Sequence, residues 1–254
     1  MESRQEVLYE VRGQCAVITL NRPDQRNAIN RPMCAQLWRA FEDFDKDPNV
    51  RVAILTGAGD KAFSAGRDLK EAAAEEGLPL PPLPLLGDSL HVSKPVIAAV
   101  NGFAIAGGWV FAQMCDLCIA ADSAKFGITE PKVGRGVAWS PPMIRMLGSR
   151  IALELMLTGR TIDARRAYEI GFVNQIVPRA ELIDASLAMA AEIIECAPLS
   201  VAAVRQVVRH TLNMGLEPAL EVGKQICAPL YETEDAKEAA RAFKEKRKPQ
   251  WKGR

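Results

Sequence analysis

The chain has 254 residues, enough for one large domain or for one domain with a small appendage. Hydrophobic residues make up 48% and charged residues 25%, which predicts a packed core, and the net charge of +1 excludes the strong field of a typical nucleic-acid-binding protein. The polar start MESRQEVLYEV and the lack of about 18 consecutive apolar residues indicate neither a signal peptide nor a membrane span, so we expect a cytoplasmic protein.

The N-terminal segment reads as a β-hairpin, with strands at residues 7–11 and 15–20. A polar loop, NRPDQRNAIN, follows at residues 21–30 and ends at Asn30, a residue type that suits a helix N-cap. Apolar residues at helical spacing between Met33 and Phe44 then predict an amphipathic helix.

Strands and small-residue turns alternate as far as residue 121. The strands are expected at residues 50–56, 62–64, 95–100 and 117–121, and a helix is expected at 68–76. This alternation predicts an α/β fold with parallel strand pairing.

Residues 77–87, GLPLPPLPLLG, are rich in proline and leucine. One interpretation is a polyproline ligand for a partner protein, and the other is a loop that covers apolar surface of the same chain. The leucines between the prolines favour the covering loop.

The chain from about residue 140 onward reads as helical, and its last helices are rich in apolar residues. We expect helices at 181–196, 199–212, 217–230 and 234–248. Their apolar faces exceed what a single helical layer can bury, so residues 1–195 are predicted to form the core and residues 196–254 a helical oligomerisation region.

Cys115 and Cys118 form a CxxC pair, which would suit a redox site or half of a zinc site. The only histidines, His91 and His210, do not lie near this pair in the sequence. We therefore interpret both cysteines as packed core residues and predict no metal site.

Two segments place small residues between a strand and a helix: Ala65-Gly66-Arg67 and Ala106-Gly107-Gly108. Small residues let a ligand approach the backbone, and the first amides of a helix carry partial positive charge. Two such turns that face each other would direct two N–H donors at one oxygen, as an oxyanion hole does. A phosphate-binding loop is disfavoured, because neither turn contains GxGxxG or GxxxxGK[ST].

The sequence resembles the enoyl-CoA hydratase/isomerase (crotonase) superfamily in a series of blocks that occur in the family's order. The blocks are NRPDQRNAIN, AFSAGRDLKE, KPVIAAVNGFAIAGG, CDLCIAADSAKFG and AFKEKRKPQWKG. The resemblance implies a spiral of ββα units with C-terminal helices, assembled as a homotrimer or a dimer of trimers. It also implies an acyl-CoA substrate, no further cofactor, and a thioester oxygen held by the backbone amides of Arg67 and Gly107.

The family's acid–base chemistry uses glutamates, and the resemblance places one of them at Glu130 in FGITEPKVG. Val110 stands where the hydratases have a second glutamate, and Ala138 stands where some isomerases and dehalogenases have an aspartate. Glu130 is therefore the expected catalytic carboxylate, since a buried glutamate beside an enolate can transfer a proton to or from carbon.

The leading hypothesis is an enoyl-CoA hydratase, a hydro-lyase of fatty acid metabolism. The alternative is an enoyl-CoA double-bond isomerase that uses the same site. A further alternative, motivated by Val110 and the basic tail KEKRKPQWKGR, is a non-catalytic acyl-CoA- or RNA-binding family member. The balanced charge of the remaining chain argues against nucleic acid as the partner.

The resemblance also implies residues for binding coenzyme A (CoA). These are Gln25, Arg26, Asn27, Ala62, Ala65, Asp68, Leu69, Phe243 and Lys246. Trp109, Val110 and Trp139 are the expected acyl-pocket residues, and the two tryptophans suggest a bulky apolar, branched or cyclic acyl group.

Overall fold

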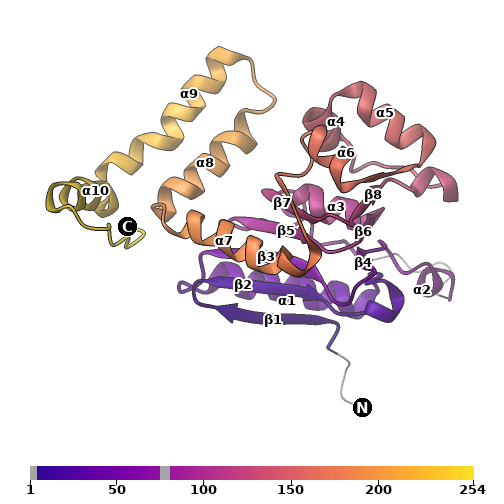
Figure 1. The fold of residues 1–254 in the computed structure, drawn as a ribbon. Coiled ribbons are helices and arrows are strands. Elements are labelled where there is room, and N and C mark those ends of the chain that lie inside the picture. The colour runs from indigo at the N-terminus through magenta and orange to yellow at the C-terminus, as the bar shows by residue number, and fades with distance from the viewer. Residues whose placement is uncertain (1–4, 75–80) are drawn as a thin grey trace.

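The computed structural model describes residues 5–74 and 81–254, and Figure 1 shows their arrangement. A six-stranded sheet has the strand order β1-β2-β3-β5-β7-β10, with β1 antiparallel to β2 and the other pairs parallel. Its strands are β1 (Val7–Arg12), β2 (Cys15–Leu20), β3 (Val52–Gly57), β5 (Val96–Val100), β7 (Leu117–Ala121) and β10 (Gln175–Val177). The central strands β3 and β5 are buried almost throughout, as expected for a parallel sheet covered on both faces.

A second sheet has the strand order β4-β6-β8-β9. Its strands are β4 (Ala62–Ser64), β6 (Phe103–Ile105), β8 (Lys125–Gly127) and β9 (Thr161–Asp163). Strands β4, β6 and β8 each come directly after β3, β5 and β7 of the first sheet, so the chain repeats a pair of strands as it advances. Strand β4 is confirmed at the expected position, whereas β6, β8 and β9 were not expected from the sequence, since three residues seldom show an alternating pattern.

Helices cover the first sheet and extend beyond it. They are α1 (Arg31–Lys46), α2 (Leu69–Ala74), α3 (Gly107–Met114), α4 (Pro141–Leu147), α5 (Ser149–Thr158), α6 (Ala164–Glu169), α7 (Leu182–Ile194), α8 (Pro198–Thr211), α9 (Leu216–Cys227) and α10 (Glu234–Glu245), with short 3₁₀ turns at Pro23–Gln25, Glu130–Val133, Arg179–Glu181 and Ala228–Glu232. Helix α1 packs on β1 and β2, and α7 packs across β3, β5 and β7. The predicted N-cap is confirmed, since Asn30 Oδ1 accepts a hydrogen bond from Met33 N at 3.0 Å.

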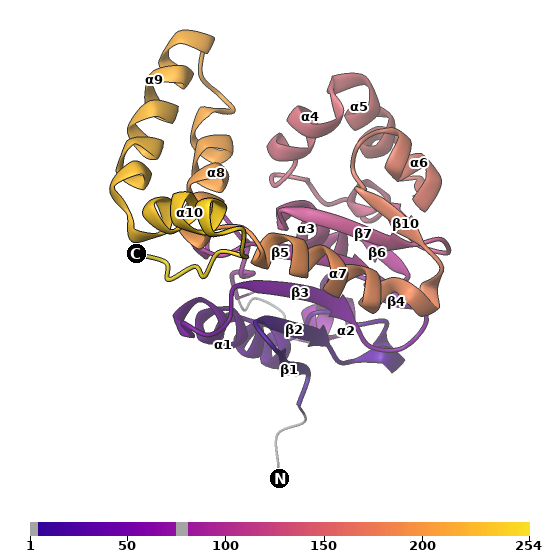
Figure 2. The same cartoon turned by 60° about the vertical axis from the view of Figure 1, so that its left-hand side comes forward.

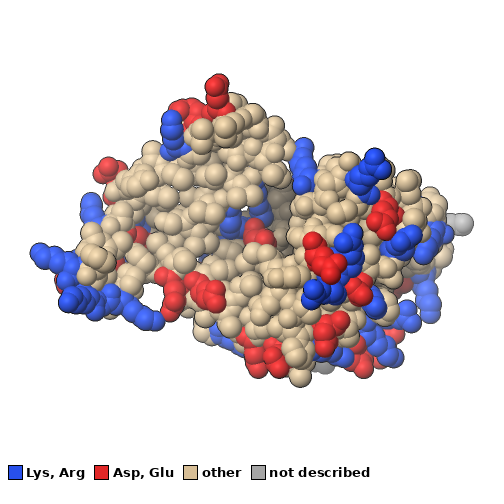
Figure 3. Space-filling view, turned by 45° about the horizontal axis from the view of Figure 1, so that its top comes forward, with Lys and Arg blue, Asp and Glu red and all other residues tan. Residues whose placement is uncertain are grey.

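Helices α8, α9 and α10 form a lobe that stands apart from the two sheets in Figures 1 and 2. Large apolar side chains remain exposed on α8 and α9, among them Val204, Leu216 and Leu220. Figure 3 shows a broad surface without charged residues over these helices. An apolar face of this size fits the predicted oligomerisation region, and the division of the chain at residue 195 stays a prediction.

The lobe is attached to the core through the segment between α7 and α8. The guanidinium of Arg51, which precedes β3, donates to the carbonyl oxygens of Ile194 and Cys196. The indole N–H of Trp251, near the end of the chain, donates to the carbonyl of Glu195 at 2.7 Å. One core side chain and one tail side chain therefore hold the same short connection.

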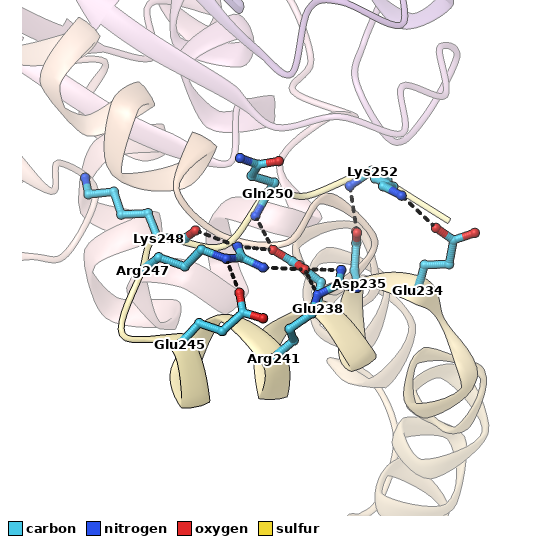
Figure 4. Close-up of polar contacts among 9 residues, drawn as sticks. All are labelled: Glu234, Asp235, Glu238, Arg241, Glu245, Arg247, Lys248, Gln250 and Lys252. Atoms are coloured by element: carbon cyan, nitrogen blue, oxygen red, sulfur yellow. Dashed lines mark hydrogen bonds and ion pairs between the residues drawn. The ribbon is translucent and has the colours of Figure 1, made fainter.

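The basic tail is largely neutralised by carboxylates of the same chain (Figure 4). Glu238 accepts hydrogen bonds from Arg247 and Arg241, which hold the pKa of its carboxyl well below the ordinary value. Lys248 pairs with Glu195, and Lys252 pairs with Glu234. These pairs weaken the interpretation of the tail as an RNA-binding patch, because few of its charges are left for phosphates.

Both cysteines of the CxxC pair are buried, and burial raises the pKa of Cys118 to about 12 and that of Cys115 well above its ordinary value. Thiols of this kind are inert packing residues. No single helix among residues 5–74 and 81–254 has both the length and the apolar composition to cross a membrane, although the bent pair Arg179–Ile194 and Pro198–Thr211 meets both criteria when taken together.

Candidate active site

A pocket of about 260 Å³ lies where the two predicted glycine turns meet residues 129–139. Its lining residues are Ala65, Arg67, Leu69, Leu83, Leu85, Ala106, Gly107, Val110, Thr129, Glu130, Val133, Arg135, Gly136 and Trp139. Most of this lining is apolar, and a few polar groups converge on it, which is the usual composition of a small-molecule site.

The two glycine turns lie in direct contact at the pocket. A Cβ placed on Gly66 would lie 2.8 Å from the amide nitrogen of Gly107, and a Cβ placed on Gly107 would lie 3.6 Å from the amide nitrogen of Arg67. In the described part of the chain, neither of these two amides donates a backbone hydrogen bond. Both N–H groups are thus available to a ligand oxygen, as the oxyanion hypothesis requires.

The backbone just before Gly107 is held in an unusual conformation. Ala106 has φ of +50° and ψ of −120°, a region that L side chains rarely adopt. Its amide donates to the carbonyl of Gly127 at 3.0 Å, which fixes the turn against β8. Strain of this kind costs about 1–3 kcal/mol and is typical of functional sites. Here it sets the direction of the first amide of α3, which carries partial positive charge.

Two other glycines of the same segment serve chain packing rather than ligand binding. A Cβ on Gly108 would lie 2.1 Å from the carbonyl oxygen of Ser64, and a Cβ on Gly102 would lie 2.5 Å from that of Lys61. Neither glycine lines the pocket. Of the three glycines between residues 102 and 108, Gly107 alone is therefore assigned to the site.

Glu130 begins the 3₁₀ turn after β8 and lines the pocket with only 9% of its surface exposed. Its Oε2 atom is buried and has no hydrogen-bond partner among the residues that the structure describes. Burial raises the pKa of Glu130, and backbone hydrogen bonds, a hydrogen bond with the side chain of Trp139 and the charge of Arg135 oppose that rise. A carboxylate whose pKa is raised is a stronger proton acceptor than a solvated one, as a general base requires.

A buried amide that the sequence analysis missed lies behind this carboxylate. Gln113 Oε1 accepts from the indole N–H of Trp109 at 3.1 Å, and Gln113 Nε2 donates to the carbonyl of Trp139 at 3.3 Å. The chain of contacts links α3 to Glu130 through Trp139. A polar residue within the apolar run of α3 was the available sequence signal.

The structure separates the three expected acyl-pocket residues. Val110 and Trp139 line the pocket. Trp109 does not, and its placement there is corrected: its side chain is fully buried and stacks on Phe172 with ring centroids 4.2 Å apart. It follows that Trp109 cannot shape the acyl group's surroundings directly, because it points into the core on the far side of α3.

Several expected CoA-binding residues have structural partners instead. The Asn27 side chain is fully buried and donates to the carbonyls of Ala58 and Ala62, so its expected contact with CoA is corrected. Asp68 pairs with Arg22 at 2.9 Å and accepts from the first amides of α2. Ala62 is buried in β4.

Other expected CoA-binding residues fall into two places. Ala65 and Leu69 line the pocket, and Gln25 and Arg26 lie exposed in the loop whose Arg26 carbonyl accepts from Ala65 N. Phe243 and Lys246 are on α10, on the opposite side of the chain from α2 in Figure 1. A single chain thus does not bring the α10 residues to the pocket.

The described part of the proline- and leucine-rich segment lies over the pocket. Leu83 and Leu85 line it, and the carbonyl of Pro82 accepts from Trp38 Nε1 and Cys34 Sγ of α1. These contacts confirm a covering loop for residues 81–87, whereas residues 77–80 lie outside the described residues. The loop closes one side of the pocket with apolar side chains.

Comparisons with known proteins agree with this site. Residues 10–254 match the family model described as Enoyl-CoA hydratase/isomerase. The chain is 40% identical over 256 residues to carnitinyl-CoA dehydratase of Escherichia coli K12, covering 95% of this chain and 96% of that protein. It is 36% identical over 259 residues to (E)-benzylidenesuccinyl-CoA hydratase of Thauera aromatica, covering 97% and 99%.

Solved structures show the same relationship. An enoyl-CoA hydratase from Mycobacterium tuberculosis H37Rv superimposes with a TM-score of 0.91 at 35% identity, over 99% of this chain and all of that one. The predicted α/β fold of the crotonase type is thereby confirmed. Matches of this extent in both sequence and structure show that the chain belongs to the enoyl-CoA hydratase/isomerase (crotonase) family.

Proposed function

We propose that the protein hydrates an enoyl-CoA thioester with Glu130 as its single catalytic carboxylate. The observation that supports this most is the unpartnered, buried Oε2 of Glu130 in the same small pocket as the turns that carry the Arg67 and Gly107 amides. The named relatives are hydratases and dehydratases, which favours water addition or removal as the reaction type.

The reaction follows from these groups. The two amides bind the thioester oxygen and stabilise the negative charge that develops on it in the enolate. Glu130 takes a proton from water as the hydroxyl adds to the β-carbon, and it then returns that proton to the α-carbon. The hydroxyl group and one proton of the water thus end on the β-carbon and the α-carbon. The double bond is lost, and the carboxylate is regenerated.

Double-bond isomerisation is the second candidate, and Val110 is the observation that favours it. Val110 is apolar, 2% exposed and adjacent to the site, where the hydratases have their second glutamate. One carboxylate without a positioned water can remove a proton from one carbon and return it to another.

The substrate's thioester part and the assembly belong to the same proposal. CoA is supplied as part of the substrate, and no further cofactor is required by this chemistry. Since Phe243 and Lys246 lie away from the pocket of their own chain, they could contact CoA only in a neighbouring copy, as in a homotrimer or a dimer of trimers. A cytoplasmic location and a role in fatty acid metabolism stay predictions.

Glu130→Gln tests the proposal, because it keeps the side-chain shape and removes the proton acceptor. Purified protein is incubated with conjugated and non-conjugated enoyl-CoAs, and products are followed by mass. A gain of one water supports the hydratase, and an unchanged mass with a moved double bond supports the isomerase. The variant should lose about 10²–10⁴-fold in rate.

Glu192→Gln, an exposed change on α7 outside the pocket, is the matched control and should keep wild-type rates. Full activity in Glu130→Gln would reject both single-glutamate reactions. Acyl-CoA binding without turnover of any member of the panel would instead favour the non-catalytic alternative.

A further inference from the structure

Two arginine side chains contribute to the pocket, and the proposed reaction uses neither of them. Arg67 and Arg135 both line it, while Glu130 is the only carboxylate among its described lining residues. The remaining walls include Leu69, Leu83 and other apolar side chains. The pocket is therefore positively charged overall, although water can solvate its interior only in part.

Arg67 has no carboxylate within ion-pair distance among residues 5–74 and 81–254. Its guanidinium is half-buried and donates to the carbonyl of Pro81 at 2.6 Å, but it forms no ion pair there. The nearby Glu71 carboxylate instead accepts from the backbone amide of Arg31.

Burial lowers the pKa of Arg67, and the like charges of Arg135 and Arg31 act in the same direction, against Cys34 and Glu71. A guanidinium stays charged under such conditions. A bound anion would therefore offset the cost of burying it.

Arg135 supplies the second charge from the opposite side of the site. It follows the 3₁₀ turn of Glu130, is exposed at the rim, and in the described chain its side chain forms no hydrogen bond or ion pair. Its charge acts both on Glu130 and on Arg67, which line the same pocket. Two guanidinium groups on one pocket suit a planar anion such as a carboxylate.

The size of the pocket decides which part of an acyl-CoA these arginines meet. The phosphates of CoA are separated from the thioester by the whole pantetheine arm. The arginines, however, share a cavity of about 260 Å³ with the Gly107 turn and Glu130. The acyl group and the thioester fit that space, whereas the whole CoA arm does not, and we therefore assign an anion bound there to the acyl group.

Building on the proposed function, we propose that Arg67 and Arg135 bind a free carboxylate on the acyl group, so that the preferred substrate is an enoyl-CoA with an anionic acyl chain. The apolar walls would then contact the carbons between the thioester and this carboxylate. Neutral acyl groups of equal size would leave the Arg67 charge unbalanced. Cationic acyl groups would be repelled by both arginines.

The test compares ligands that differ in one charge. Saturated acyl-CoAs that end in a carboxylate, at three chain lengths, are each paired with their methyl ester, and dissociation constants are measured by calorimetry. At the best length, wild-type protein should bind the carboxylate about 10–100-fold more tightly than the ester. Arg135→Gln and Arg67→Gln should reduce this preference to about 2-fold or less.

Arg150→Gln removes the same charge from an exposed site on α5 outside the pocket, and it should retain the preference. The inference is overturned if wild-type protein prefers the carboxylate at no length. It is equally overturned if Arg135→Gln weakens acid and ester alike, since that result assigns the arginine to a CoA phosphate. Because binding is the readout, a carboxylate preference without hydration of the matching enoyl-CoAs would reject the proposed function and retain this inference.

Discussion

The two sides of the pocket are built in opposite ways. One side, which we call the backbone wall, consists of the turns Ala65–Arg67 and Ala106–Gly108, where added Cβ atoms would meet neighbouring atoms at distances down to 2.1 Å. The other side, the side-chain wall, is residues 129–139, where a Cβ on Gly134 or Gly136 would meet nothing within 4 Å. The backbone wall must therefore be rigid, whereas the side chains of the side-chain wall are free to vary.

Each construction suits one kind of chemistry. Two amides stabilise a developing charge only if they are already in place, and packing of backbone against backbone provides that rigidity. Selection of an acyl group depends instead on side chains such as Arg135 and Trp139, which can differ between relatives without disturbing the oxyanion turns. Four substitutions test this contrast, from the largest expected effect to the smallest.

Gly108→Ala should destabilise the protein most, because its Cβ would lie 2.1 Å from the carbonyl oxygen of Ser64 and must push α3 away from β4. We expect a loss of about 3 kcal/mol and a fall in melting temperature of about 10 °C. Thermal unfolding followed by circular dichroism measures it. An unchanged melting temperature would mean that the backbone wall is not closely packed.

Gln113→Leu removes the buried amide behind the side-chain wall and leaves the indole N–H of Trp109 without a partner. The loss of stability should be about 2 kcal/mol. Freeing the Trp139 segment should also weaken its hydrogen bond to Glu130, which raises the pKa of that carboxyl and moves the pH profile of kcat/KM to higher pH. Gln206→Leu, an exposed change on α8, is the control. If Gln113→Leu loses stability without a shift in the pH profile of kcat/KM, the role of Gln113 is purely structural.

Glu130→Gln should stabilise the folded protein at neutral pH, by less than the two changes above, while it lowers the rate about 10²–10⁴-fold. Burial raises the folded-state pKa above the ordinary value of 4.5, so the wild type loses stability as pH rises from that value through the raised one. The variant has no such loss. Denaturant unfolding at several pH values should show a difference that is near zero below pH 4.5 and constant well above it, and a difference that instead shrinks with rising pH would contradict the assignment.

Gly136→Ala should change stability least, by less than about 0.5 kcal/mol, since the residue is exposed and its Cβ would enter open space. It makes the same chemical change as Gly108→Ala on the other wall. If both variants lost stability equally, the contrast between the two walls would be wrong.

Sequence patterns predicted the parts of the fold that are long or strongly periodic. The hairpin, the helix that begins after Asn30 and the buried strands around Ile54 and Ala98 are confirmed at nearly the expected positions. Of the second sheet only β4 was expected, and β6, β8 and β9 were missed because they are held by pairing with distant strands rather than by local pattern.

The candidate site, like the fold, could be predicted only in part from the sequence. The two turns could be found from their small residues, but the sequence could not tell that Gly108 meets Ser64 and that Gly107 faces the pocket. Trp109 and Trp139 are both tryptophans near the site in sequence, and only their positions on α3 and on the loop decide that one is core and the other lining. The fold brings together residues from separate segments of the chain, namely Arg135, Gln113, Leu83 and Leu85. No local spacing in the sequence reveals that these residues lie near one another.

The helical lobe is held to the core both at the connection between α7 and α8, by Arg51 and Trp251, and along α8 itself, where Arg205 pairs with Asp116 at 2.9 Å. Two separate attachments of this kind oppose a rotation of the lobe about Glu195, so the exposed apolar side chains of α8 and α9 are presented to a partner in one direction.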